Sequence, residues 1–473
     1  MTTLPRDGAE VAPSANPQSA IRNPQSQRVA IFGQSLISDW NHGNAHFLRG
    51  VMRALGQLGH AVTFYEQENN WALTHLIAEQ GPDAVTAFAA AFPTMRPVLY
   101  PPRSGAALDD WLRGILVETD IALVHEWQEP ELIRAVGRLG GEYPHLTTLF
   151  HDTHYRAYSE PATMRALDLA RYDAVLAFSP SITAIYRRDF GLPHVYTVHE
   201  AADPDLFRPL DRPKQQDVVF VGNWGDRDRN ETMREYVFAP SAALPDLRFA
   251  LYGVRYDATT QQAMRDPYHV DYRGWAANYA APEIYAASRM SLHIPRGQYT
   301  TALYGTPTIR VFEVLACGLP LISLPWSDSD GLFTAGQDYL VVHDQAAMIA
   351  TIRRLAADDT ARAEIGAHAR ATILARHTCR HRTEQILDIV AALRADRPHP
   401  PTPSPEGRGG VRWAISPLPS GEGAGEGAAQ PQPLPAISPL PSGEGLGEGA
   451  AQPQPLPAIS PLPLGEGAGE GAR

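Results

Sequence analysis

The sequence predicts an α/β fold with two doubly wound, Rossmann-like parallel sheets, one in each half of the chain. Short runs rich in Val, Ile, Leu and Phe alternate with amphipathic segments of about ten to fifteen residues, a pattern typical of βα units. Residues 201–216 are rich in proline and charge and interrupt this alternation. Because 473 residues exceed one usual hydrophobic core, we expect two domains.

We expect the amino-terminal domain at residues 28–200, the junction at 201–216 and the carboxyl-terminal domain at 217–396. Residues 1–27 and 397–473 hold few apolar residues, and we expect both segments to be disordered. In the second of them the unit AISPLP recurs, starting at Ala414, Ala436 and Ala458. A linker that binds a partner through its proline-rich turns is the alternative for this tail.

The charge balance excludes several classes of partner. The chain has 40 Lys and Arg against 52 Asp and Glu, a net charge of -12, which offers no electrostatic basis for binding nucleic acid or an anionic membrane. No run is apolar enough for a membrane span, and the amino terminus lacks the apolar segment of an export signal. The two cysteines, Cys317 and Cys379, form neither a disulfide framework nor a metal cluster. We therefore expect a cytoplasmic protein.

The first β-loop-α unit starts at Arg28. A strand, VAIFG, is followed by a polar loop that includes Asp39 and by the amphipathic segment HFLRGVMRALGQLG, and the strand AVTFYE comes next. The loop lacks the full GxGxxG pattern of dinucleotide sites. Gly43 and Asn44 could let a phosphate or a sugar approach the backbone, or they could belong to a plain connecting loop.

The alternation continues with the strands IALVHEW, LTTLF, AVLAF and HVYTV. Polar residues follow them, notably His125 with Glu126 and the run His151, Asp152, Thr153 and His154, and the carboxyl ends of parallel strands face the ligand crevice. His, Asp and His on one loop without a second ligand cluster do not favour a metal site. A histidine that orients a sugar or phosphate oxygen is the preferred interpretation.

The second half opens with the strand DVVFVG and the loop NWGDRDRN. Later, residues 306–320 predict a helix with Thr306 as N-cap and Pro307 in its first turn, which would present free N–H groups to an anion. Gly318 ends this helix before a buried strand. Arg310 and Glu313 share one face of the helix, and a surface ion pair is the alternative to a functional role.

Several phrases, in order and at strand ends, together indicate a family. They are HDTH, HEAADPDLFRP, FVGNWGDRDRN, HIPRGQY and TPTIRVFEVLACGLPLIS with the following GQDYLVV. Residues 28 to about 395 resemble the GT-B glycosyltransferases, and more closely the CgeB-like branch named for spore maturation. The resemblance implies that the first domain binds an acceptor, that the second binds a nucleotide sugar, and that the last helices pack back on the first domain.

The resemblance also implies roles for single residues. Glu313 would bind the donor ribose, and Arg310 would face the diphosphate. The loop that binds the leaving group would contain Gly222, Asn223, Arg227 and Arg229, with Gly274 and Trp275 flanking the base. As alternatives, the two arginines of this loop would pair with Asp226 and Asp228, and Trp275 would pack in the core.

One position departs from the family pattern. Many retaining relatives carry two glutamates with seven residues between them, and the first falls on Gly305 here, so the contact to the donor sugar is unassigned. Asp328 and Asp330 could approach the sugar, although a turn before Gly331 is the commoner meaning. An inverting enzyme would need a base, for which the candidates are His151, Asp152 and Asp39, in that order, while Gly43, Asn44, His125 and Glu126 would contact the acceptor sugar.

We therefore expect a glycosyltransferase that uses a nucleotide sugar as co-substrate, with no metal ion and no cofactor. Its acceptor would be a glycan, a lipid-linked molecule or a protein. Two alternatives are a nucleotide-sugar epimerase of similar fold and a non-catalytic protein of glycan binding or envelope assembly.

Overall fold

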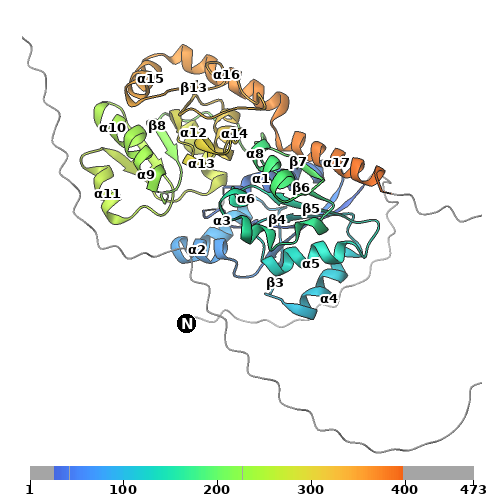
Figure 1. Ribbon diagram of the computed structural model, residues 1–473. Helices are drawn as coiled ribbons and strands as arrows, with labels where there is room; N and C mark the ends of the chain where they lie inside the picture. The colour runs from blue at the N-terminus through green and yellow to red at the C-terminus, as the bar shows by residue number, and fades with distance from the viewer. Residues whose placement is uncertain (1–25, 42, 226, 398–473) are drawn as a thin grey trace, which may run out of the picture. The chain divides into compact units, whose positions relative to one another are not determined.

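The computed structural model describes residues 26–41, 43–225 and 227–397 (Figure 1). It contains two parallel β-sheets, each with helices on both faces, as the sequence predicts. Most of the two segments predicted to be disordered, residues 1–27 and 397–473, lie outside the described residues. No helix in the described ranges is long and apolar enough to cross a bilayer.

The first sheet has the strand order β3-β2-β1-β4-β5-β6-β7. Its direction of winding reverses between β1 and β4, and open parallel sheets of this kind bind ligands at the carboxyl ends of the strands where this reversal occurs. The strands are β1 (Arg28–Phe32), β2 (Ala61–Gln67), β3 (Val98–Tyr100), β4 (Ile121–His125), β5 (Thr147–Asp152), β6 (Ala174–Ala177) and β7 (Val195–Thr197).

Alternate residues of these strands point to opposite faces of the sheet and pack into two separate hydrophobic cores. Ala30 and Phe32 belong to the core under α4, α5 and α8, whereas Val29 and Ile31 belong to the core under α1. The helices are α1 (Ala45–Gln57), α2 (Trp71–Gln80), α3 (Asp83–Ala91), α4 (Gly105–Leu116), α5 (Pro130–Gly140), α6 (Arg156–Ser159), α7 (Pro161–Arg165) and α8 (Pro180–Asp189), with the short turn η1 (Leu169–Arg171).

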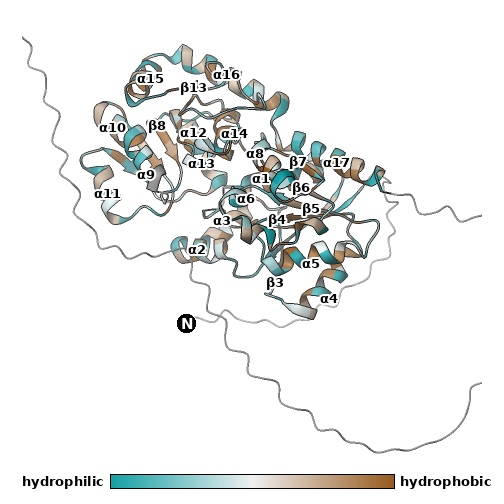
Figure 2. Ribbon diagram, viewed as in Figure 1, coloured by the Kyte–Doolittle hydropathy of each residue, from teal (hydrophilic) through white to brown (hydrophobic). Residues whose placement is uncertain are grey.

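The second sheet has the order β10-β9-β8-β11-β12-β13. Its strands are β8 (Gln216–Val221), β9 (Phe249–Tyr252), β10 (Val270–Tyr272), β11 (Ser288–His293), β12 (Leu321–Ser323) and β13 (Leu340–Val341). Its helices and short turns are α9 (Arg227–Met233), η2 (Arg234–Phe238), α10 (Ala239–Ala243), α11 (Ala258–Arg265), η3 (Asn278–Ala280), α12 (Ala281–Ala286), α13 (Gly297–Thr301) and α14 (Ile309–Ala316). The chain ends with α15 (Gln345–Ala357), α16 (Asp359–Arg376) and α17 (Cys379–Ala395), which carry hydrophilic and hydrophobic residues along their length (Figure 2).

Helix α17 follows the second sheet in sequence but packs against the first. Cys379, Ile386 and Val390 belong to the same core as α1 and the strands of the first sheet. Gly50 of α1 permits this packing, since a Cβ there would lie 2.3 Å from the Cys379 Sγ atom. The return of the last helix to the first domain, implied by the family resemblance, is confirmed.

Two elements differ from the sequence prediction. The sequence pattern predicts a helix from Trp111 to Glu118, whereas helix α4 begins at Gly105, because its buried stripe already begins at Leu108 and continues with Leu112 and Leu116. Strand β3 was not predicted; it lies at the edge of the sheet and pairs only with β2 among the described strands. Three residues with two exposed side chains carry too little alternation to predict a strand.

The close packing of α1 on α17 leads to a matched test with two glycines of α1. Gly50→Ala should lower the free energy of unfolding by about 1–3 kcal/mol, because the new methyl group overpacks the contact with Cys379. Gly56→Ala is the control: no atom lies within 4 Å of the position that its new methyl group would take, so its higher helix propensity should leave stability unchanged or raised by up to about 1 kcal/mol. Urea denaturation followed by circular dichroism measures both, and equal effects of the two substitutions would contradict the packing described.

Candidate functional site

The loops at the carboxyl ends of the two sheets contact each other. After β1, Asn41 accepts a hydrogen bond of 2.6 Å through Oδ1 from the side chain of Asn223, which follows β8. Gly43 lies against α14, since a Cβ on it would be 3.4 Å from the Ile309 side chain. The candidate residues of the two halves therefore belong to one region.

The amino end of α14 is not capped by its own N-cap side chain. The N-cap residue is Thr308, so the prediction of Thr306 was wrong; the Thr306 hydroxyl instead donates to the Leu303 carbonyl at 3.1 Å. The Thr308 hydroxyl lies 3.1 Å from Nε2 of His293 and makes no bond to the helix. The Thr308 side chain thus satisfies no first-turn amide of α14, although the Thr308 carbonyl accepts the Val311 amide at 3.0 Å.

A hydrogen-bond chain fixes this orientation of Thr308. The Ser323 hydroxyl donates to the Leu324 carbonyl, so at 2.9 Å it accepts from Nδ1 of His293. Nε2 of His293 must then accept from the Thr308 hydroxyl. Burial, together with the charge of Arg229, lowers the pKa of His293 to about 3, which keeps the ring neutral as this chain requires.

Glu313 is fully buried and receives donors from both halves of the molecule. Arg310 pairs with one carboxylate oxygen, and His46 of α1 and Asn278 bind the other at 3.1 and 2.7 Å. The backbone N–H of Asp203 donates to Nε2 of His46, so Nδ1 carries the proton that His46 gives to Glu313. Burial alone would raise the pKa of Glu313, but Arg310, His46 and Asn278 lower it below its usual value.

The Arg310–Glu313 pair is therefore not the surface ion pair of the alternative interpretation, because the Glu313 side chain has no exposed area. A carboxylate offers about four acceptor positions, and the three observed donors leave about one of them unused. The ribose role of Glu313 stays a prediction that this geometry permits.

The loop after β8 approaches its neighbours closely. Tyr256 donates to the Gly222 carbonyl at 2.7 Å, and the side-chain oxygen of Asn223 accepts from the Val254 amide at 3.0 Å. The Arg229 guanidinium lies over the Phe220 ring at 5.9 Å and acts on His293, so this arginine is directed towards the strand ends. The side chain of Arg227 lies outside the described part of the structure.

Two residues predicted beside the nucleotide base have different surroundings. Gly274 has a positive φ of 71°, and no atom lies within 4 Å of the position of a Cβ there. Its carbonyl accepts the Gly253 amide at 2.9 Å. Trp275 is partly buried against Trp40 and Val254, as the packing alternative predicted.

Gly305 explains the departure from the retaining pattern. Its φ is 73°, and a Cβ would lie 2.4 Å from the Ser329 hydroxyl oxygen and 2.6 Å from the ring of Pro180. The backbone at this position has no space for a glutamate side chain. One carboxylate oxygen of Asp328 accepts the Phe333 amide at 2.8 Å in a turn that also joins Asp328 to Gly331, whereas its Oδ1 is buried without a hydrogen-bond partner among the described residues. A contact of Asp328 with the donor sugar stays a prediction.

The two neighbouring candidates for a base lie on opposite faces of β5. Asp152 faces α8 and accepts a 2.5 Å hydrogen bond from the Tyr186 hydroxyl, and burial raises its pKa. His151 faces α1, with its ring 5.6 Å from Phe47 and 5.5 Å from His125. Neither ring nitrogen of His151 has a hydrogen-bond partner among the described residues, and burial lowers its pKa to about 4.

The third candidate, Asp39, already accepts two hydrogen bonds within the protein. Arg49 donates to it at 3.1 Å and the Asn278 amide at 3.0 Å, so this carboxylate joins α1 to the second half. Burial raises the pKa of Asp39, although Arg49 offsets part of the effect. Of the three candidates, His151 alone has both polar side-chain atoms available to a ligand within the described structure.

The predicted acceptor residues form a hydrogen-bonded group. Asn44 donates to the Thr153 hydroxyl, which lies 3.2 Å from Nε2 of His125. Glu126 accepts the Thr153 amide at 2.8 Å and pairs with Arg156. Burial and the neighbouring Asp152 raise the pKa of Glu126 well above its usual value. This group lies at the carboxyl ends of β4 and β5, as predicted.

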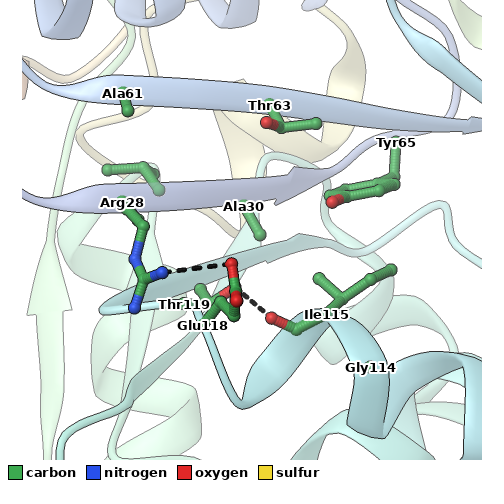
Figure 3. Close-up of a pocket in the computed structure, with 10 residues that line it drawn as sticks. Arg28, Ala30, Ala61, Thr63, Tyr65, Gly114, Ile115, Glu118 and Thr119 are labelled. Atoms are coloured by element: carbon green, nitrogen blue, oxygen red, sulfur yellow. Dashed lines mark hydrogen bonds and ion pairs between the residues drawn. The ribbon is translucent and has the colours of Figure 1, made fainter. Parts of the chain in front are cut away.

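Figure 3 shows a cavity of about 220 Å³ at the other end of the first sheet. Arg28 and Ala61, the first residues of β1 and β2, line it together with Glu118, which pairs with Arg28 at 3.2 Å. Ligands of such sheets bind at the carboxyl ends of the strands, so this cavity is separate from the candidate site. Within the described residues, no group of three or more His, Cys, Asp or Glu could hold a metal ion.

Residues 206–388 match a family model described as glycosyl transferase-like. The second half is therefore similar to a glycosyltransferase domain. The sequence prediction of this enzyme class is thereby confirmed, and no curated protein matches the chain.

Solved structures place the whole pair of sheets in the GT-B fold. An alpha-glucosyltransferase in complex with UDP-glucose and DNA is 13% identical and covers 77% of this chain and 100% of its own, with a TM-score of 0.57. Anabaena Alr3699/HepE in complex with UDP-glucose is 13% identical over 77% of this chain and 100% of its own, at a TM-score of 0.56. Sucrose-phosphate synthase from Thermosynechococcus elongatus is 16% identical over 78% and 99%, at 0.54.

Sequence reasoning missed four residues of this site: His46, Glu200, Asn278 and His293. The phrases quoted above contain Glu200 and His293, but a strand pattern does not show which side chains meet across two domains. His46 and Asn278 lie 267 and 35 residues from Glu313, and only the folded chain brings them together.

The environment of His151 leads to a pH-dependent prediction. Its pKa of about 4 lies below the ordinary value of 6.5, so the unfolded chain binds the proton more readily and the folded state loses stability as pH falls from 6.5 towards 4. Relative to His151→Gln, the unsubstituted chain should lose up to about 3 kcal/mol over this range. Urea denaturation at several pH values measures the difference, and a difference that does not change with pH would contradict the buried neutral ring.

Proposed function

We propose that the chain is a glycosyltransferase that moves a sugar from a UDP-sugar to an acceptor, without a metal ion or a cofactor. The amino end of α14 carries this proposal. Its N-cap hydroxyl is held by His293, its first turn lies at the strand ends, and Arg310 is the second residue of the helix. Amides and a guanidinium arranged in this way suit a diphosphate.

The same groups would act on the leaving group. As the bond from the sugar carbon to the diphosphate breaks, negative charge grows on the departing oxygen, and positive groups fixed in place stabilise that state. Arg310, Arg229 and the helix terminus supply such charge from the protein itself, which supports transfer without a metal ion. Glu313 would accept the ribose hydroxyls, and its ionised state suits that role.

The choice of UDP follows from proteins of the same fold, whose structures contain UDP or UDP-glucose. In the first half, the neutral ring of His151 would take the proton of the acceptor hydroxyl, with Asn44, His125 and Thr153 around the acceptor sugar. A base of this kind predicts inversion at the sugar carbon, which agrees with the absence of space for a glutamate at Gly305.

Two further assignments belong to this proposal. The phrases from HDTH to GQDYLVV support the CgeB-like branch of the GT-B glycosyltransferases. The two cysteines are free thiols, both buried, which supports a reducing cytoplasmic environment. The acceptor would be a glycan, a lipid-linked molecule or a protein.

Incubation of the chain with a panel of nucleotide sugars tests the reaction class. The proposal predicts release of UDP from at least one UDP-sugar and a product of inverted configuration, read by NMR. An isomerised nucleotide sugar would indicate the epimerase alternative. Binding of glycan without binding of any nucleotide would indicate a glycan-binding protein and would overturn the proposal.

A pair of arginine substitutions tests the diphosphate contact. Arg310→Lys keeps the positive charge beside Glu313 but loses the planar guanidinium, which can bind a phosphate through two N–H groups. The substitution should raise the Kd of UDP about tenfold. The control is Arg380→Lys, an exposed arginine of α17 paired with Glu384, which should leave the Kd unchanged. Isothermal titration calorimetry gives both values, and an unchanged Kd in Arg310→Lys would exclude this contact.

A further inference from the structure

A second buried carboxyl group, Glu200, lies beside the amino end of α14. Glu200 is 4% exposed and belongs to the segment that leads from β7 towards the second sheet. The backbone amide of Ile309, the first residue of α14, lies close enough to its carboxyl group to favour the ionised form. Its Oε1 atom is buried without a hydrogen-bond partner among the described residues.

The ionisable groups around Glu200 come from α14, from α13 and from its own segment. Arg310 and Glu313 act on it from α14, and Tyr299 of α13 lies within electrostatic range. Next to it in sequence, the side chain of His199 is directed to Asp330, at 2.8 Å. Glu200 thus shares Arg310 with a second carboxyl group.

The two glutamates have opposite environments. Glu313 receives hydrogen bonds from Arg310, His46 and Asn278, which favour its ionised form. Glu200 has no comparable set of hydrogen-bond donors. Burial, together with the charge of Glu313, raises the pKa of Glu200 well above its usual value. When the pKa values of two neighbouring carboxyl groups differ in this way, one group remains a carboxylate and the other is a neutral acid that can donate a hydrogen bond.

An ionised Glu200 would repel an anion at the helix terminus, whereas a neutral one could bind it. We propose that Glu200 is a donor-binding residue that, as a neutral carboxylic acid, donates a hydrogen bond through its O–H to the diphosphate at the amino end of α14. The inference rests on the proposed function. The acid would add an O–H donor to those of the helix amides and Arg310. Its buried oxygen would gain a hydrogen-bond partner only when the nucleotide is bound.

Two substitutions separate the neutral acid from a carboxylate and from a purely structural side chain. Glu200→Gln keeps the shape and supplies an N–H donor, so the Kd of UDP should stay within about threefold of the unsubstituted value. Glu200→Met keeps the volume but removes the donor, and it should raise the Kd of UDP at least about tenfold. The Kd of uridine, which has no diphosphate, should be the same in all three proteins.

Calorimetric titration of the full chain with UDP, and ligand-observed NMR with uridine, measure these values. If Glu200→Met binds UDP as tightly as the unsubstituted chain, or if Glu200→Gln weakens UDP binding as much as Glu200→Met does, the proposal is wrong while the proposed function stands. An equal loss of uridine binding would show a structural role and would also overturn it. If the unsubstituted chain binds no UDP, the UDP-sugar function fails and this inference fails with it.

Discussion

The ionised Glu313 carboxylate is the group on which both halves of the molecule depend. A charge buried without exposed area costs several kcal/mol unless hydrogen-bonding partners surround it. Arg310 comes from the same helix, Asn278 from the turn η3, and His46 from α1 of the first half. Because one donor comes from the other domain, the ionisation of Glu313 and the contact between the two sheets stabilise each other.

The arrangement around α14 shows why an anion site can persist in a folded protein. An N-cap threonine usually satisfies the amides of its own helix, but His293 holds the Thr308 hydroxyl through a chain that continues to Ser323. Without this side-chain cap the helix loses about 1 kcal/mol of stability, the value for typical helices, and the amide that the hydroxyl would otherwise bind is left for a ligand. Loss of local stability in favour of a binding site is typical of functional regions.

Much of the fold follows from sequence, because the alternation of apolar strands and amphipathic helices is a local signal. The helix after Gly305, the turn at Asp328 and the packing of Trp275 could also be predicted from the sequence. The N-cap was assigned to Thr306 because capping rules consider only neighbours, whereas His293 decides the orientation of Thr308. Contacts between domains, such as that of His46, leave no periodic pattern. The opposite directions of His151 and Asp152 follow from the period of a strand, once its ends are known.

A crystal structure of the chain with UDP bound tests the central claim most directly, namely that the amino end of α14 is the diphosphate site. We expect diphosphate oxygens within about 3 Å of the first-turn amides of α14 and of the Arg310 guanidinium, and a ribose hydroxyl at a similar distance from Glu313. A nucleotide bound elsewhere, or one whose diphosphate extends into solvent away from α14, would contradict it.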